Sequence, residues 1–236
     1  MTLGASAISS ILRIIERLTR PEPLGSQTST INSSVTPDRP WLDFLYAFVN
    51  QTLPLVPVLL VLYLLTQVAR PSERPLRLMG LDCTRPWRDL GWAFAIAAGI
   101  GIPGLAFYVF SKAIGINTTV VAANMTENWW TIPVYIWAAF RAGMVEETIM
   151  VGYLTTRWQQ IGWGAAHIVI TSALIRGTYH LYQGFGGFIG NAIMGAAFGW
   201  LYLRTHRLWI LIMAHTLLDI VSFVGYALLH DYVTWL

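Results

Sequence analysis

Charge and cysteine are both scarce in this chain of 236 residues. Charged residues make up 11% of the sequence and hydrophobic residues 55%, whereas a soluble globular chain carries about 25% charged residues. This composition excludes a water-soluble domain and predicts a membrane protein. The single cysteine, Cys83, excludes an intramolecular disulfide, a zinc thiolate cluster and an iron–sulfur centre. A metal would have to be held by histidine and carboxylate side chains.

Lysine is almost missing too, since Lys112 is the only lysine among the 15 basic residues. The arginines lie scattered at the ends of apolar segments, so the formal net charge of +3 forms no continuous basic patch. We therefore expect the bilayer, and no nucleic acid, as a partner. The sequence also has no phosphate-binding loop, dinucleotide fingerprint, HExxH or GxSxG motif.

Residues 1–40 differ from the rest of the chain. Near the N-terminus, apolar residues recur at helical spacing with polar residues between them, which predicts an amphipathic helix lying on the membrane surface. Residues 21–40 are rich in serine, threonine and proline, and this composition predicts a flexible linker.

From Trp41 onward the chain contains six long apolar runs, each long enough to cross a bilayer at about 20 residues per crossing. The predicted fold is an all-α, polytopic membrane helix bundle of about six transmembrane helices. The runs cover residues 42–68, 89–112, 130–157, 163–184, 186–203 and 208–229.

Basic residues near the membrane ends are unevenly divided between the two sides, which predicts that the richer side faces the cytoplasm and both termini face outward. The richer side has Arg70, Arg74, Arg77, Arg85, Arg88, Arg157, Arg204 and Arg207, and the other side has Arg39 and Lys112.

Ionisable residues lie inside three of these runs. Glu146 and Glu147 precede Arg157 by eleven and ten residues, which places them roughly 15 Å from the membrane end. An ionisable residue at a membrane helix centre costs about 2.5 to 3.5 kcal/mol, so this pair indicates a functional site. Being adjacent, the two side chains point about 100° apart, so one faces a cavity while a neighbouring helix holds the other.

The fourth and sixth runs supply partners at i,i+4 spacing, with Arg176 and His180 on one helix face and His215 and Asp219 on another. Glu146 and His215 have similar depths, whereas His180 falls near the opposite end of its run. We therefore expect the fourth helix to be tilted, shifted or broken.

The fifth run carries a face of small residues, Gly187, Asn191, Gly195 and Gly199, at every fourth position. Such a face lets another helix approach closely and predicts that Asn191 points into the bundle as a supporting residue.

The order of EE, then RGTYH (Arg176 to His180), then HTLLD (His215 to Asp219) resembles the CPBP family of intramembrane proteases. That family includes the CAAX prenyl endopeptidases and the bacterial Abi proteins of bacteriocin processing and self-immunity. The resemblance covers about residues 133–226. It implies that residues 130–236 form a catalytic transmembrane core, preceded by transmembrane helices in residues 41–129.

Two positions depart from the family pattern of EExxxR, FxxxH and HxxxN or HxxxD. The arginine position of the first motif is Val151, and the phenylalanine position of the second is Arg176. We hypothesise that Arg176 compensates by pairing with Glu146 or Glu147. The alternative is that the departures mark an inactive relative.

The resemblance implies a role for each residue. Glu146 is the general base for the attacking water, His180 orients that water, and Glu147 assists or is structural. His215 and Asp219 polarise the scissile carbonyl. The family has been described both as metal-independent glutamate proteases and as metalloproteases. In the second case Glu146, His180, His215 and Asp219 would hold a divalent metal such as zinc.

The predicted function is therefore an intramembrane endopeptidase in a bacterial plasma membrane, with a membrane-anchored protein or peptide as substrate. A proton-coupled transporter and an inactive immunity or scaffold relative are the alternatives, because buried ionisable groups also line ion paths. The sequence does not determine the oligomeric state.

Overall fold

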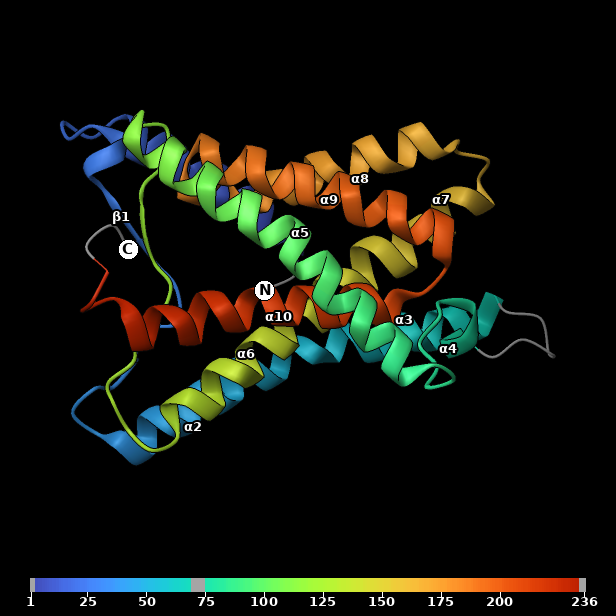
Figure 1. Cartoon of the computed structure of the whole chain (residues 1–236), viewed down its shortest axis with the longest axis horizontal. Helices are drawn as coiled ribbons and strands as arrows, with labels where there is room; N and C mark the ends of the chain where they lie inside the picture. The colour runs from blue at the N-terminus through green and yellow to red at the C-terminus, as the bar shows by residue number, and fades with distance from the viewer. Residues whose placement is uncertain (1–2, 69–74, 234–236) are drawn as a thin grey trace.

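The computed structural model describes residues 3–68 and 75–233, and the described chain is mostly helical (Figure 1). The first half contains α1 (Leu3–Leu18), η1 (Leu24–Ser26), β1 (Thr28–Thr30), α2 (Pro40–Thr52), η2 (Leu53–Leu55), α3 (Val56–Val68), α4 (Pro75–Leu78), α5 (Pro86–Ala113) and β2 (Thr119–Val121). The second half contains α6 (Thr131–Glu146), η3 (Glu147–Leu154), α7 (Thr155–Gln160), α8 (Ala165–His180), η4 (Leu181–Gln183), α9 (Phe185–Thr205) and α10 (Leu208–Leu229).

Two helix pairs form the frame of the bundle. Helix α8 packs along α9, and α6 packs along α10. Helix α5 crosses the bundle diagonally and contacts both α9 and α10, as Figure 1 shows.

Among the described residues, four helical segments are long and apolar enough to cross a membrane, which indicates an integral membrane protein. These segments are Pro40–Gln67, Pro86–Ala113, Phe185–Thr205 and Leu208–Leu229. The other two predicted runs are interrupted: α6 passes into the π-helix η3, and α8 has 16 residues. Because each piece is shorter than a full crossing, the count of six stays a prediction. Arg70 and Arg74, used for the orientation, lie outside the described residues.

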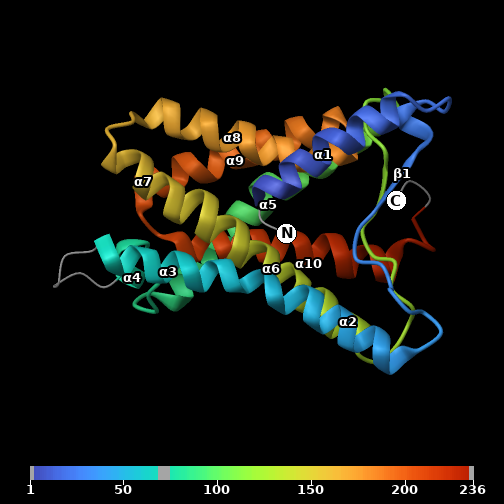
Figure 2. The same ribbon diagram turned by 180° about the vertical axis from the view of Figure 1, so that it is seen from behind.

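The N-terminal segment forms the predicted amphipathic helix, α1, which packs on α8 and η4 (Figure 2). In the structure, the segment predicted to be a flexible linker contains η1 and β1. Its strand β1 pairs in parallel with β2, with Thr28 opposite Thr119. Composition alone does not reveal this partner, because the two strands are about ninety residues apart in sequence and are joined by backbone hydrogen bonds.

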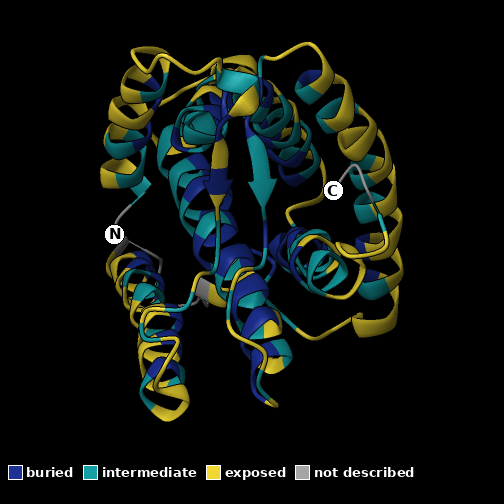
Figure 3. Cartoon of the chain, turned by 90° about the vertical axis from the view of Figure 1, so that its left-hand side faces the viewer, coloured by how far each residue is buried: buried dark blue, intermediate teal, exposed yellow. Residues whose placement is uncertain are grey.

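The buried residues gather in the middle of the bundle, while large apolar side chains are exposed along its outer helices (Figure 3). An apolar exterior is what a lipid environment requires. The main core cluster includes Met150, Val151, Phe198, Leu211 and Ile212. Arg176, with 1% of its surface exposed, is the largest of the fully buried side chains in the described residues. A cation at the centre of an apolar bundle needs partners, and these define the candidate site.

Candidate active site

Three parts of the bundle bring six ionisable side chains together. The junction of α6 and η3 supplies Glu146 and Glu147, α8 supplies Arg176 and His180, and α10 supplies His215 and Asp219. All six were predicted from the sequence, and the structure joins them through a chain of ion pairs.

Arg176 lies at the centre of this cluster. Its Nη2 atom is 2.5 Å from Glu147 Oε1 and 3.3 Å from Glu146 Oε2. Its guanidinium carbon lies 5.3 Å from the centroid of the Phe198 ring, which is within cation–π distance. The hypothesised pairing of Arg176 with the glutamates is therefore present. The guanidinium comes from α8, while Val151, at the family's arginine position, is a fully buried apolar residue.

The two glutamates have different surroundings, as their angular separation predicts. Glu147 has no exposed surface, and its Oε1 atom accepts hydrogen bonds from Arg176 and from His215 Nδ1, which is 2.6 Å away. The Glu146 side chain is 12% exposed. Its Oε2 atom accepts a hydrogen bond of 2.8 Å from the Tyr179 hydroxyl. Glu147 is therefore the anchoring carboxylate, and Glu146 is the accessible one.

Local sequence explains why the helices approach so closely here. A β-carbon on Gly143 of α6 would lie 2.8 Å from the Ile212 carbonyl oxygen of α10. A β-carbon on Gly195 of α9 would lie 3.0 Å from Arg176 Cδ. Larger residues at these positions would push the helices apart. The predicted small-residue face of α9 is thus confirmed as the contact with α8.

The π-helix η3 begins at Glu147 and follows Glu146 directly. A π-helical turn is wider than an α-helical turn and occurs frequently at functional sites. It changes the direction of the side chains that follow the glutamate pair. The hydroxyl groups of Thr148 and Thr155 at its two ends are buried with no hydrogen-bond partner among the described residues.

His180 reaches the cluster because α8 ends at this residue. The chain continues as the short turn η4 and then reverses at Gly184, whose φ angle is +112°. Helix α8 is continuous from Ala165 to His180, and the chain leaves the α-helix only after His180. His180 Nε2 lies 3.8 Å from Glu146 Oε2. Neither ring nitrogen makes a hydrogen bond with another described residue, so the ring is placed to bind water or substrate next to Glu146.

On α10, His215 Nε2 lies 3.6 Å from Asp219 Oδ2. His215 is buried, whereas the Asp219 side chain is 22% exposed. The imidazole ring therefore links the anchoring glutamate on one side to a more open carboxylate on the other.

One predicted residue is not brought into the cluster, and two others were missed. Asn191 donates a hydrogen bond to the Gly187 carbonyl oxygen of its own helix, and no contact with the six side chains is found in the described structure. The sequence analysis did not select Tyr179, whose hydroxyl donates a hydrogen bond to Glu146. It also did not select Arg141, whose Nε donates a hydrogen bond to Gln51 Oε1. The signals were present: Tyr179 adjoins His180, and Arg141 is a charged residue within an apolar run.

The metal site predicted from Glu146, His180, His215 and Asp219 is not formed. These residues make two separate pairs, and no group of three or more His, Cys, Asp or Glu side chains that could hold a metal occurs in residues 3–68 and 75–233. The Arg176 guanidinium already contacts both glutamates and His215. Because this positive charge repels a second cation beside Glu146 and His215, the residues as arranged do not fit a metal.

Residues 128–221 match the protein family described as type II CAAX prenyl endopeptidase Rce1-like. No curated protein and no solved structure matches the chain significantly. The matched segment contains all six residues of the cluster, and the match supports a membrane protease. The match confirms, over these residues, the predicted similarity to the CAAX protease family.

Proposed function

We propose that this protein is an intramembrane endopeptidase that uses Glu146 to activate water. The observation that carries the proposal is the position of Glu146. Its carboxylate is partly exposed, is held through one oxygen by Tyr179 and Arg176, and lies beside His180. A fixed base next to an imidazole with free ring nitrogens is the arrangement that general-base hydrolysis needs.

In the proposed reaction, Glu146 takes a proton from a water molecule that also contacts His180. The resulting hydroxide attacks the carbonyl carbon of the scissile peptide bond and forms a tetrahedral oxyanion. That proton then passes from Glu146, directly or through His180, to the leaving nitrogen, and the carbon–nitrogen bond breaks. Glu146 returns to its ionised form.

The oxyanion needs a hydrogen-bond donor, and His215 is the candidate. As an imidazolium its ring donates through both nitrogens, from Nδ1 to Glu147 and from Nε2 toward the substrate. Asp219, 3.6 Å from Nε2, balances the charge of the imidazolium. An ionised Asp219 accepts hydrogen bonds only, so it supports His215 and does not itself hold the oxyanion.

The proposed substrate is a membrane-anchored protein or peptide. Such a chain reaches the cluster from the bilayer without entering water, which suits a site between membrane helices. Localisation to a bacterial plasma membrane is part of the same proposal.

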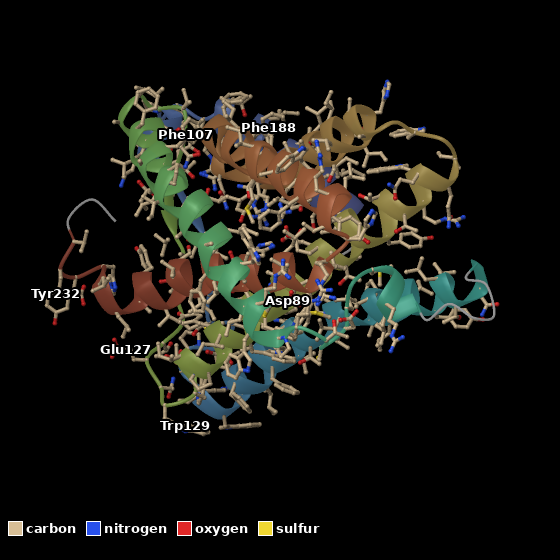
Figure 4. All side chains as sticks on the ribbon, turned by 45° about the vertical axis from the view of Figure 1, so that its right-hand side comes forward. Asp89, Phe107, Glu127, Trp129, Phe188 and Tyr232 are labelled. Carbon is tan, nitrogen blue, oxygen red and sulfur yellow. The ribbon has the colours of Figure 1, made fainter. Side chains whose placement is uncertain are left out.

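The test is cleavage of a quenched membrane-peptide library by the full chain purified in detergent. Glu146→Gln and His180→Ala should abolish cleavage, while the exposed residues Glu127 and His167 provide the controls Glu127→Gln and His167→Ala. Figure 4 labels Glu127, which lies away from the centre of the helix bundle. A chelator should leave the wild-type rate unchanged.

Each of the other outcomes would contradict the proposal in a different way. A wild-type protein that cuts no peptide would contradict the protease activity. Glu146-dependent proton flux without cleavage would favour a transporter. Loss of wild-type cleavage with chelator would restore the metal alternative.

A further inference from the structure

A cavity of about 320 Å³ lies away from the six-residue cluster, between α5, α9 and α10. Its volume is within the range of about 300–1,000 Å³ that is usual for small-molecule sites. Its lining comes from the start of α5, the end of α9 and the start of α10. All three are candidate membrane spans, so the cavity lies at one membrane surface.

The mouth of the cavity is basic. Arg85, Arg88 and Arg207 line it, and Asp89 is the only acidic residue in the lining. Arg207 pairs with Asp82 and Asp89, while its Nε atom is buried without a partner among the described residues. Figure 4 labels Asp89 near this end of α5.

Two of these arginines are available to a ligand. Arg85 and Arg88 are exposed, and neither side chain makes an ion pair or hydrogen bond with another residue in the described part of the chain. Because Arg207 is shared between Asp82 and Asp89, these three groups together carry one negative charge, and with Arg85 and Arg88 the mouth keeps an excess of one positive charge. This charge is complementary to a phosphodiester.

Farther along α5 the lining becomes apolar. Trp92 follows Arg88 by one helical turn, and Ile96 follows Trp92 by another. Leu201 and Leu211 line the same region from α9 and α10. Basic side chains at the membrane surface and apolar side chains one or two turns inside match the headgroup and acyl chains of a lipid. By contrast, a second cavity of about 140 Å³ has no charged residue in its lining.

From this gradient we propose that the cavity binds one anionic phospholipid, with its phosphodiester on Arg85 and Arg88 and an acyl chain along Trp92 and Ile96. Basic pockets between transmembrane helices recognise such headgroups. The pair of Arg207 and Asp89 fixes the start of α5 to the start of α10 and so keeps the cavity open. The proposal does not depend on the protease activity.

The experiment measures lipid binding to the full chain in detergent. Phosphatidylglycerol, phosphatidylcholine and inorganic phosphate are titrated separately into the wild type, Arg85→Gln/Arg88→Gln and the control Arg77→Gln/Arg157→Gln. The control removes two exposed or partly exposed charges outside the cavity. We expect the wild type to prefer phosphatidylglycerol and the Arg85/Arg88 variant to bind it about tenfold or more weakly, with the control unchanged.

A second measurement tests location. Phosphatidylglycerol with brominated acyl chains should quench tryptophan emission less in Trp92→Phe than in the wild type. Equal affinity for the two lipids, equal weakening in the control, or equal binding of free phosphate would each overturn the proposal. Quenching that is unchanged in Trp92→Phe would also overturn it.

Discussion

Two arginines of this chain each pair with two carboxylates, but in different surroundings. Arg176 is 1% exposed, and it bonds Glu146 and Glu147 among histidines in the centre of the bundle. Arg207 is 16% exposed, and it bonds Asp82 and Asp89 at the membrane surface. The same charged groups form a candidate reaction centre at one place and a joint between helix ends at the other.

The difference teaches that burial and neighbouring groups decide what an ion pair does. Around Arg176, two histidines and a tyrosine add proton donors and acceptors to the carboxylates. Around Arg207, the partners are the start of α5 and the loop before it. Breaking an ion pair lowers the free energy of unfolding by an amount that depends on burial, because a buried charge without its partner is far more costly than an exposed one.

The largest effect should come from removing the buried guanidinium. Arg176→Met leaves Glu146 and Glu147 without their cation, and we expect a loss of about 3–5 kcal/mol in the free energy of unfolding. Arg207→Met should lose less than half as much, because the Arg207 guanidinium is 16% exposed and one of its two carboxylates, Asp82, is 22% exposed. Thermal unfolding of both variants in the same detergent measures this. Equal losses of unfolding free energy in the two variants would contradict the proposed difference between the Arg176 and Arg207 ion pairs.

The two glutamates should respond in opposite ways. Glu146→Gln should lower kcat by about 10²-fold or more with little change in stability, because it removes the base and keeps its shape. Glu147→Gln should lower the melting temperature more, because it weakens the contacts to Arg176 and His215. Cleavage rates and melting curves of both variants separate these effects. If Glu147→Gln alone were inactive and fully stable, the assigned roles would be reversed.

A smaller effect is expected at Tyr179, whose hydroxyl bonds Glu146. Tyr179→Phe removes one hydrogen bond, so kcat should fall about tenfold with KM unchanged, since the bond positions the base and does not bind substrate. The exposed Tyr232, labelled in Figure 4, offers the control Tyr232→Phe. A raised KM at constant kcat would instead place Tyr179 in substrate binding.

The smallest effect concerns how the melting temperature depends on pH in acid. Hydrogen bonds from Thr84 and Arg207 hold the pKa of Asp82 below its usual range. A lowered pKa in the folded state stabilises the fold above the unfolded-state value of about 3.9, and this stabilisation is lost as the pH falls further. Asp82→Asn should therefore reduce the pH dependence of the melting temperature below about pH 4. An unchanged dependence would show that this pair adds nothing measurable.

Parts of the site could be predicted from local sequence. Glu146 and Glu147 stand out because charge is rare in apolar runs, and i,i+4 spacing alone places His215 and Asp219 on one helix face. The departure at Val151 and Arg176 also suggested a compensating pair, which the structure contains.

Other features depended on contacts between distant segments. Tyr179 looks like an ordinary aromatic residue in sequence and becomes significant only because α8 points its hydroxyl at Glu146. Asn191 faces a polar atom of its own helix despite lying on the small-residue face. The residues predicted to hold a metal do not fit one as arranged, because the positive charge of Arg176 lies beside Glu146 and His215.

The sequence by itself determined the helical membrane character, the amphipathic N-terminal helix and the six ionisable residues. Hydrophobicity, helical periodicity and the cost of buried charge are local properties, and they can be read along the chain. Only the tertiary structure decided that α8 ends at His180, that β1 pairs with β2 and that Arg176 lies between two glutamates. These features depend on which distant groups satisfy a buried hydrogen bond or charge, and such partners are set by packing.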